Sequence, residues 1–134
     1  MFKSAKSIAL KLLSRRPYFE AELILKLREH DLSEAEIHEA IQECKRYGYL
    51  DDDERVRSII RREMQKGKGP RYIEAKLKML KIRSPLLYQI YSKEMEIEVI
   101  KKILLKKPSK DPIKLINYLQ RRGFSLDIIR KIIL

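Results

Sequence analysis

The feature that most limits the fold of this chain is an apolar pattern that occurs three times. When the three segments are aligned with offsets of 50 and then 42 residues, five columns contain only apolar residues. The columns are Leu23, Ile73, Leu115; Leu27, Leu77, Leu119; Leu32, Ile82, Phe124; Ile37, Leu87, Ile129; and Ile41, Tyr91, Ile133. Neighbouring columns are four or five residues apart, and apolar residues recur at three- and four-residue steps almost throughout the chain. We therefore expect tandem helical repeats at 1–50, 51–94 and 95–134, each burying its apolar face against a neighbour.

Start and stop signals divide this pattern into short helices. Capping residues precede several apolar stretches, and three glycines stand where a helix is expected to end. The start signals are the Ser33–Glu36 capping box, Gly69-Pro70, Ser84-Pro85, Asp111-Pro112 and Ser125, and the expected C-caps are Gly48, Gly67 and Gly123. The expected fold is all-α, with three tandem three-helix repeats that resemble helix-turn-helix units and form an elongated, curved array.

The composition agrees with helices rather than a sheet. Leu, Ile, Lys, Arg and Glu dominate, while Val occurs twice, Thr is absent and only four glycines are present. Residues 1–16 carry no acidic group and are amphipathic, as in a transit peptide. The favoured interpretation is a first core helix that places its apolar residues on one face. These residues are Phe2, Ala5, Ile8, Ala9, Leu12 and Leu13.

Three consecutive aspartates, Asp51 to Asp53, raise the question of a metal site. A calcium loop needs alternating ligands, a central glycine and a distal glutamate, and that spacing is missing. Asp51 instead suits a helix N-cap with Glu54 three residues on, and Asp52 and Asp53 fall in the first turn, where the helix dipole favours negative charge. We expect a helix start with Tyr49 and Leu50 packed beside it, and no metal site.

The charge of the chain points to an anionic partner. The formal net charge is +12, of which 1–50 carry +1, 51–94 carry +5 and 95–134 carry +6. Nucleic acid, an acidic protein groove and an anionic membrane surface all fit this charge. The predicted binding residues form a basic face: Arg57, Arg61, Arg62, Lys66, Lys68, Arg71, Lys106, Lys107, Lys110, Arg121 and Arg122. The alternative is a solvated face that only aids solubility.

No pattern for catalysis is present in the sequence. GKGPR at 67–71 lacks the Walker spacing, although a helix N-terminus beside Lys68 and Arg71 could bind a phosphate or a carboxylate. The two histidines fall in different predicted helices, and Cys44 is the only cysteine. We expect no enzyme, no catalytic residue and no cofactor. A lone cysteine and the lack of a 20-residue apolar run favour a cytoplasmic protein without a membrane span.

Tyrosines are interspersed with the basic residues. Stacking on nucleic-acid bases would require exposed rings. Tyr72, Tyr88, Tyr91 and Tyr118 lie within the periodic helices, so core or half-buried packing is expected for most of them.

Several blocks of the sequence resemble the RecX family, bacterial regulators of the RecA recombinase. GYLDD at 48–52 and GKGPRYIEAKL at 67–77 are similar to the family signature, with the family's spacing. The opening and closing blocks also resemble the family: ALKLLSRR at 9–16, AELILKL at 21–27 and KLINYLQRRGFSLDIIRKII at 114–133. Two positions depart from the pattern. Arg55 stands where the family usually has an aromatic residue, and Phe19 stands where a Ser cap is frequent.

The resemblance implies three-helix repeats in a bent rod that binds along the groove of the RecA–single-stranded-DNA filament. It implies a monomeric regulator that damps the ATPase, recombinase and coprotease activities of RecA in DNA repair, homologous recombination and the SOS response. The basic face of the second and third repeats is expected to meet the filament. The alternatives are a DNA-binding helical module that acts without RecA, and a membrane-surface or organelle-targeted protein.

Overall fold

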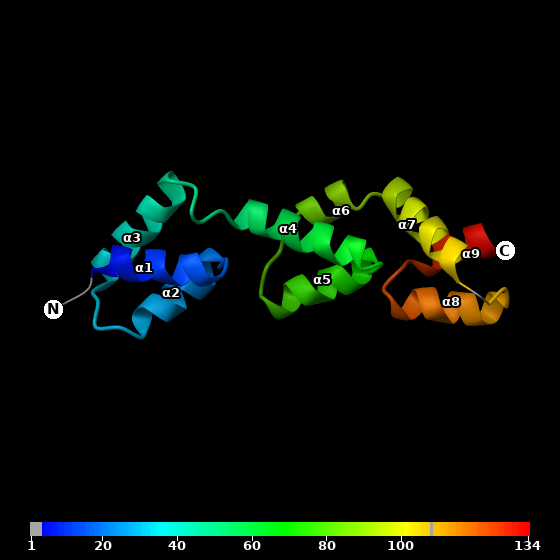
Figure 1. Ribbon diagram of the computed structural model, residues 1–134, viewed down its shortest axis with the longest axis horizontal. Helices are drawn as coiled ribbons and strands as arrows, with labels where there is room; N and C mark the ends of the chain where they lie inside the picture. The colour runs from blue at the N-terminus through cyan, green and yellow to red at the C-terminus, as the bar shows by residue number, and fades with distance from the viewer. Residues whose placement is uncertain (1–3, 108) are drawn as a thin grey trace. The chain divides into compact units, whose positions relative to one another are not determined.

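The computed structural model describes residues 4–107 and 109–134, and within these ranges the chain forms nine helices and no strand (Figure 1). The helices are α1 Ala5–Arg15, α2 Glu20–Arg28, α3 Glu34–Arg46, α4 Asp52–Gln65, α5 Pro70–Met79, α6 Leu86–Ile90, α7 Lys93–Lys106, α8 Pro112–Arg121 and α9 Leu126–Ile133. The all-α fold with tandem groups of three helices is confirmed. Two compact units, Met1–Arg55 and Val56–Leu134, divide the chain. The repeat boundaries and the curvature of the array stay predictions.

The apolar columns form the cores of both units. Every column residue is buried or half-buried, which confirms that the columns mark inward-facing positions, although the third column, Leu32, Ile82 and Phe124, lies between helices. In the first unit, α1, α2 and α3 pack around a cluster that Tyr18, Cys44 and Leu50 complete. The predicted core helix is α1, with Ala5 and Ala9 buried, while the expectation for Phe2 falls outside the described residues. Burial raises the pKa of the Cys44 thiol, which suits an inert core residue.

The acidic segment caps two helices. The Asp51 carboxylate accepts a hydrogen bond from the Glu54 amide at 3.1 Å, as predicted for the start of α4. The Asp52 carboxylate accepts one from the Glu20 amide at 2.8 Å, at the start of α2. Asp52 therefore has a tertiary role that its place in the first turn of α4 did not predict. Among residues 4–107 and 109–134, no group of three potential metal ligands is found.

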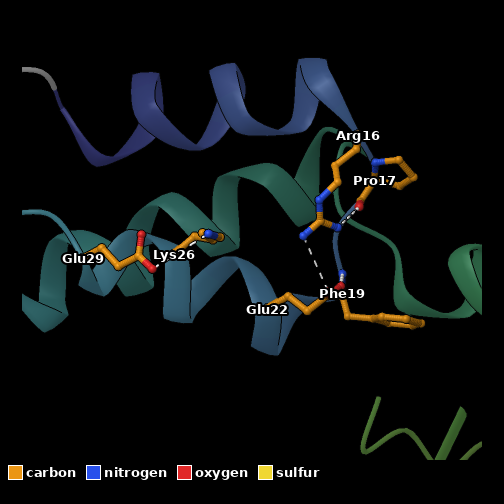
Figure 2. Close-up of polar contacts among 6 residues, drawn as sticks. All are labelled: Arg16, Pro17, Phe19, Glu22, Lys26 and Glu29. Carbon is orange, nitrogen blue, oxygen red and sulfur yellow. Dashed lines mark hydrogen bonds and ion pairs between the residues drawn. The ribbon is translucent and has the colours of Figure 1, made fainter. Parts of the chain in front are cut away.

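Phe19 is the N-cap residue of α2, although its side chain cannot accept a hydrogen bond. The Glu22 carboxylate instead accepts from the Phe19 amide at 2.8 Å, and Arg16 lies 3.6 Å from that carboxylate (Figure 2). The Arg55 guanidinium lies 4.9 Å from the centroid of the Phe19 ring. The two positions that depart from the family pattern thus contact each other, as a cation–π pair.

The expectation for Tyr49 is wrong, and the expectation for the tyrosines holds only in part. Leu50 is buried, but Tyr49, which follows the left-handed turn at Gly48 (φ +76°), is 57% exposed. Tyr91 is buried and donates to the Lys68 carbonyl at 2.8 Å. Tyr72 and Tyr88 lie on outer faces of their helices and are exposed, while Tyr118 is half-buried.

Two carboxylates are buried in the second unit, and the apolar pattern alone gave no sign of either. Glu63 of α4 pairs with Lys76 of α5 at 2.8 Å. Burial would raise the pKa of Glu63, but Lys76 and Lys66 outweigh it and hold the pKa below its usual value. Glu96 of α7 accepts from the Ser125 amide at 2.7 Å, at the start of α9. Glu63 therefore joins the consecutive helices α4 and α5, and Glu96 joins α7 to the start of α9.

We expect replacement of Glu96 with Gln to stabilise the protein at pH 8 and to have little effect near pH 4. Burial raises the pKa of Glu96, and the Ser125 amide and Arg71 offset this only partly. Because the folded-state pKa lies above the unfolded value, the wild type gains stability as pH falls through the folded pKa and loses it as pH rises. Gln keeps an acceptor for the Ser125 amide without the buried charge.

Thermal unfolding at the two pH values measures this effect. Glu98→Gln is the matched control, since Glu98 lies on the same helix and is exposed. The expectation fails if Glu96→Gln shifts the melting temperature by the same amount at pH 4 and pH 8.

Candidate anion-binding site

Two glycine turns interlock in the second unit. The Gly69 amide donates to the Arg122 carbonyl at 2.7 Å, and the Arg71 amide donates to the Gly123 carbonyl at 3.0 Å. A Cβ on Gly69 would stand 2.4 Å from the Gly123 carbonyl atoms, so only glycine allows this approach. Two amides at the N-terminus of α5 therefore donate to carbonyls of the same chain. A phosphate bound at residues 67–71 would need these same amides as donors.

The Arg122 side chain also connects the two glycine turns. Its Nε donates to the Gly67 carbonyl at 2.9 Å, and its Nη2 donates to the Lys66 carbonyl. Both carbonyls follow the end of α4, where unpaired carbonyls attract a cation. Arg122 is half-buried and also lies 5.4 Å from the centroid of the Tyr118 ring. Of the residues in the predicted basic face, this one has its guanidinium directed at the protein's own backbone.

The structure distributes the other predicted residues over several elements. Lys68 lies 4.6 Å from the Tyr72 ring centroid, and Lys66 lies 3.6 Å from the Glu63 carboxylate. Arg61, Arg62, Arg71, Lys106, Lys110 and Arg121 are exposed, and Arg57, Lys68 and Lys107 are half-buried. Whether they act as one continuous face stays a prediction.

A hollow beside α8 brings two of the predicted residues together. Its volume is about 720 Å³, and its lining residues are Lys107, Ser109, Lys114, Leu115, Asn117, Tyr118, Gln120 and Arg121. Three of these are cations, four carry neutral polar groups and none is acidic. Such a lining suits a ligand with several negative charges.

Lys114 is the residue of this hollow that the predicted face omitted. It lies seven positions before Arg121 on α8, close to two full helical turns, so the two side chains share a face. Lys107 also lines this hollow, and its Nζ lies 3.4 Å from the centroid of the Tyr118 ring. The seven-residue spacing of 114 and 121 within α8 was therefore a usable signal in the sequence, whereas Lys107 lies at the C-cap of α7, outside that helix.

The two units differ sharply in charge. Residues 1–55 contain ten basic and twelve acidic residues, for a net charge of −2, whereas 56–134 contain 21 and seven, for +14. A polyanion is therefore attracted to the second unit, which contains the hollow. Among the described helices, none combines the length and the apolar character that a membrane crossing needs.

Comparisons with known proteins agree on one family. Residues 5–44 match the family model described as the first three-helix domain of RecX. Regulatory protein RecX of Vibrio vulnificus (strain CMCP6) is 32% identical over 95% of this chain and 89% of that protein. Regulatory protein RecX of Caldanaerobacter subterraneus subsp. tengcongensis is 33% identical over 96% of this chain and 68% of that protein. The crystal structure of RecX from Lactobacillus salivarius superimposes with a TM-score of 0.77 and 25% identity, over 96% of this chain and 92% of that one.

Proposed function

The chain belongs to the RecX family of regulatory proteins, and from this premise we propose that it binds the RecA–single-stranded-DNA filament and lowers the activities of RecA. The bound protein reduces ATP hydrolysis, strand exchange and coprotease activity without chemistry of its own. RecA and its DNA are the partners that the family resemblance implies for this chain.

The observation that carries this proposal is the cationic hollow beside α8. Lys107, Lys114 and Arg121 line it without an acidic neighbour in the lining. Lys114 and Arg121 lie about 10.5 Å apart along the helix axis, so the pair suits two charges of an extended polyanion rather than a single small anion. Ser, Asn, Gln and Tyr side chains complete the lining, and these types commonly bond phosphate and sugar oxygens.

Neutralising the hollow tests the proposal. In Lys107→Gln/Lys114→Gln/Arg121→Gln, the concentration for half-inhibition of the RecA ATPase on single-stranded DNA is expected to rise about tenfold or more. The slope of log Kobs for the filament against log salt concentration is expected to become less steep by about 2, from about 0.7 for each lost phosphate contact.

The matched control removes the same charge elsewhere in the second unit. Lys78→Gln/Lys81→Gln/Arg83→Gln changes three exposed cations that do not line the hollow. Equal losses in the two triple variants would show that only bulk charge matters. A wild-type protein that leaves the ATPase unchanged at saturation would overturn the regulatory proposal. Arg57→Ala/Arg61→Ala/Arg62→Ala tests the α4 part of the basic face in the same assay.

The second candidate is a DNA-binding module that acts without RecA. The net charge of +14 on the second unit favours it, since attraction to the phosphate backbone requires no protein partner. Equal affinity for the filament and for bare single-stranded DNA, with no effect on the ATPase, would support this candidate against the regulator.

A further inference from the structure

A second, smaller hollow in the same unit differs in chemistry from the cationic one. It has a volume of about 320 Å³, and its lining residues are Met64, Gln65, Gly67, Met95, Val99, Lys102, Ile103 and Lys106. Met64, near the end of α4, and three apolar residues of α7 are half-buried in its wall. We call it the α4–α7 groove. Its volume lies at the low end for ligand sites and is enough for one or two inserted side chains.

The apolar wall follows from the way α7 packs. Glu96 and Ile100 are buried, and Glu96 bonds the residue that precedes α9. Met95, Val99 and Ile103 recur every four residues, so they share a neighbouring stripe that is only half-buried. Gly67, whose carbonyl accepts from Arg122, also lines the groove, and a Cβ at this position would lie 3.5 Å from Ile103 Cδ1. The turn at Gly67, which Arg122 binds, therefore lies beside this stripe.

The rim of the groove is positive. Lys102 and Lys106 are exposed and line it, and no acidic residue is among its lining residues. A complementary ligand carries an apolar side chain with carboxylates beside it. Methionine side chains on two walls can adapt to the shape of an inserted group.

We propose that the α4–α7 groove receives an apolar side chain carried by an acidic segment of the RecA protein in the filament. This inference rests on the proposed function, and it names the protein contact as distinct from the DNA contact. A nucleotide is the poorer fit, because base binding relies on aromatic platforms and the lining contains no aromatic ring.

The test compares two ligands, a RecA filament assembled on single-stranded DNA and the bare DNA strand. In Met95→Gln/Val99→Asn, affinity for the filament is expected to fall at least tenfold, as for an interface anchor, while affinity for bare DNA stays unchanged. Leu105→Gln is the matched control, since Leu105 lies on α7, is 86% exposed and does not line the groove. Fluorescence anisotropy at fixed salt measures both affinities.

A charge variant covers the case in which the apolar substitutions disturb folding. Lys102→Glu/Lys106→Glu is expected to weaken filament binding more than Lys93→Glu/Lys101→Glu, which alters two exposed lysines of the same helix outside the groove. Thermal unfolding establishes that each variant is folded.

The outcomes separate this inference from the proposed function. If the wild type binds the filament and the groove variants bind it as tightly as their controls, the inference is wrong and the proposed function stands. If the groove variants lose filament and bare-DNA affinity equally, the groove contacts DNA and the inference is also wrong. If the wild type does not bind the filament, the proposed function fails and the inference fails with it.

Discussion

Replacement of Gly123 with Ala is expected to destabilise the second unit by about 3 kcal/mol, the combined cost of backbone strain and overpacking. The new Cβ would stand 2.5 Å from the Tyr72 amide nitrogen, and φ at this position is +98°. The obstructing atom belongs to the backbone of α5, so no side-chain rotation relieves the contact. Gly69→Ala meets the Gly123 carbonyl from the other side, at 2.4 Å, and is expected to have a similar effect.

Gly48→Ala measures the cost of backbone strain without the cost of overpacking. Gly48 also has a positive φ, +76°, but no atom lies within 4 Å of the Cβ position. The free energy of unfolding of Gly48→Ala is therefore expected to fall by about 1 kcal/mol. Urea unfolding measures the free energy, and hydrogen exchange of the Gly69 and Arg71 amides reports directly on the interlocked turns. A loss for Gly123→Ala no larger than that for Gly48→Ala would contradict the close approach.

Adjacent arginines are expected to give opposite results. Arg122→Ala removes two charge-assisted hydrogen bonds, to the Gly67 and Lys66 carbonyls, and is expected to cost about 2 kcal/mol of unfolding free energy. Arg121 is exposed and lines the cationic hollow, so Arg121→Ala is expected to stay within about 0.5 kcal/mol of the wild type. Arg121→Ala is therefore expected to bind the filament more weakly while it keeps the stability of the wild type, whereas Arg122→Ala is expected to lose stability.

Urea unfolding and filament anisotropy on the same two proteins measure these effects. Arg122→Lys keeps the charge but loses the planar fork, so it is expected to recover only part of the stability. Equal stability of Arg121→Ala and Arg122→Ala would show that the hydrogen bonds from Arg122 to the Gly67 and Lys66 carbonyls do not stabilise the second unit.

Local signals predicted most of the fold. The Ser33 capping box, the Asp51 cap and the turn at Gly48 each depend on residues within one helical turn, so short sequence windows contain the necessary information. The apolar columns predicted the buried faces for a related reason, since helical periodicity fixes which side chains share a side.

Long-range contacts account for what the sequence could not predict. Arg121 and Arg122 have the same chemistry, and only the approach of the turn at Gly67, 55 residues away, separates their roles. In the sequence, Glu63 and Glu96 resemble acidic residues of the surface. Only the structure shows that they contact Lys76 and the Ser125 amide. Asp52 caps a helix that begins 32 residues earlier. Each assignment required the tertiary structure, because the partner is distant in sequence.

The opposite signs of the two units have a consequence for how the protein meets a polyanion. In the field of such a partner, the −2 unit is repelled while the +14 unit is attracted. Contact with such a partner is therefore expected to begin at the second unit. Added salt is expected to weaken both the attraction and the repulsion, and with them the preference of the partner for the second unit.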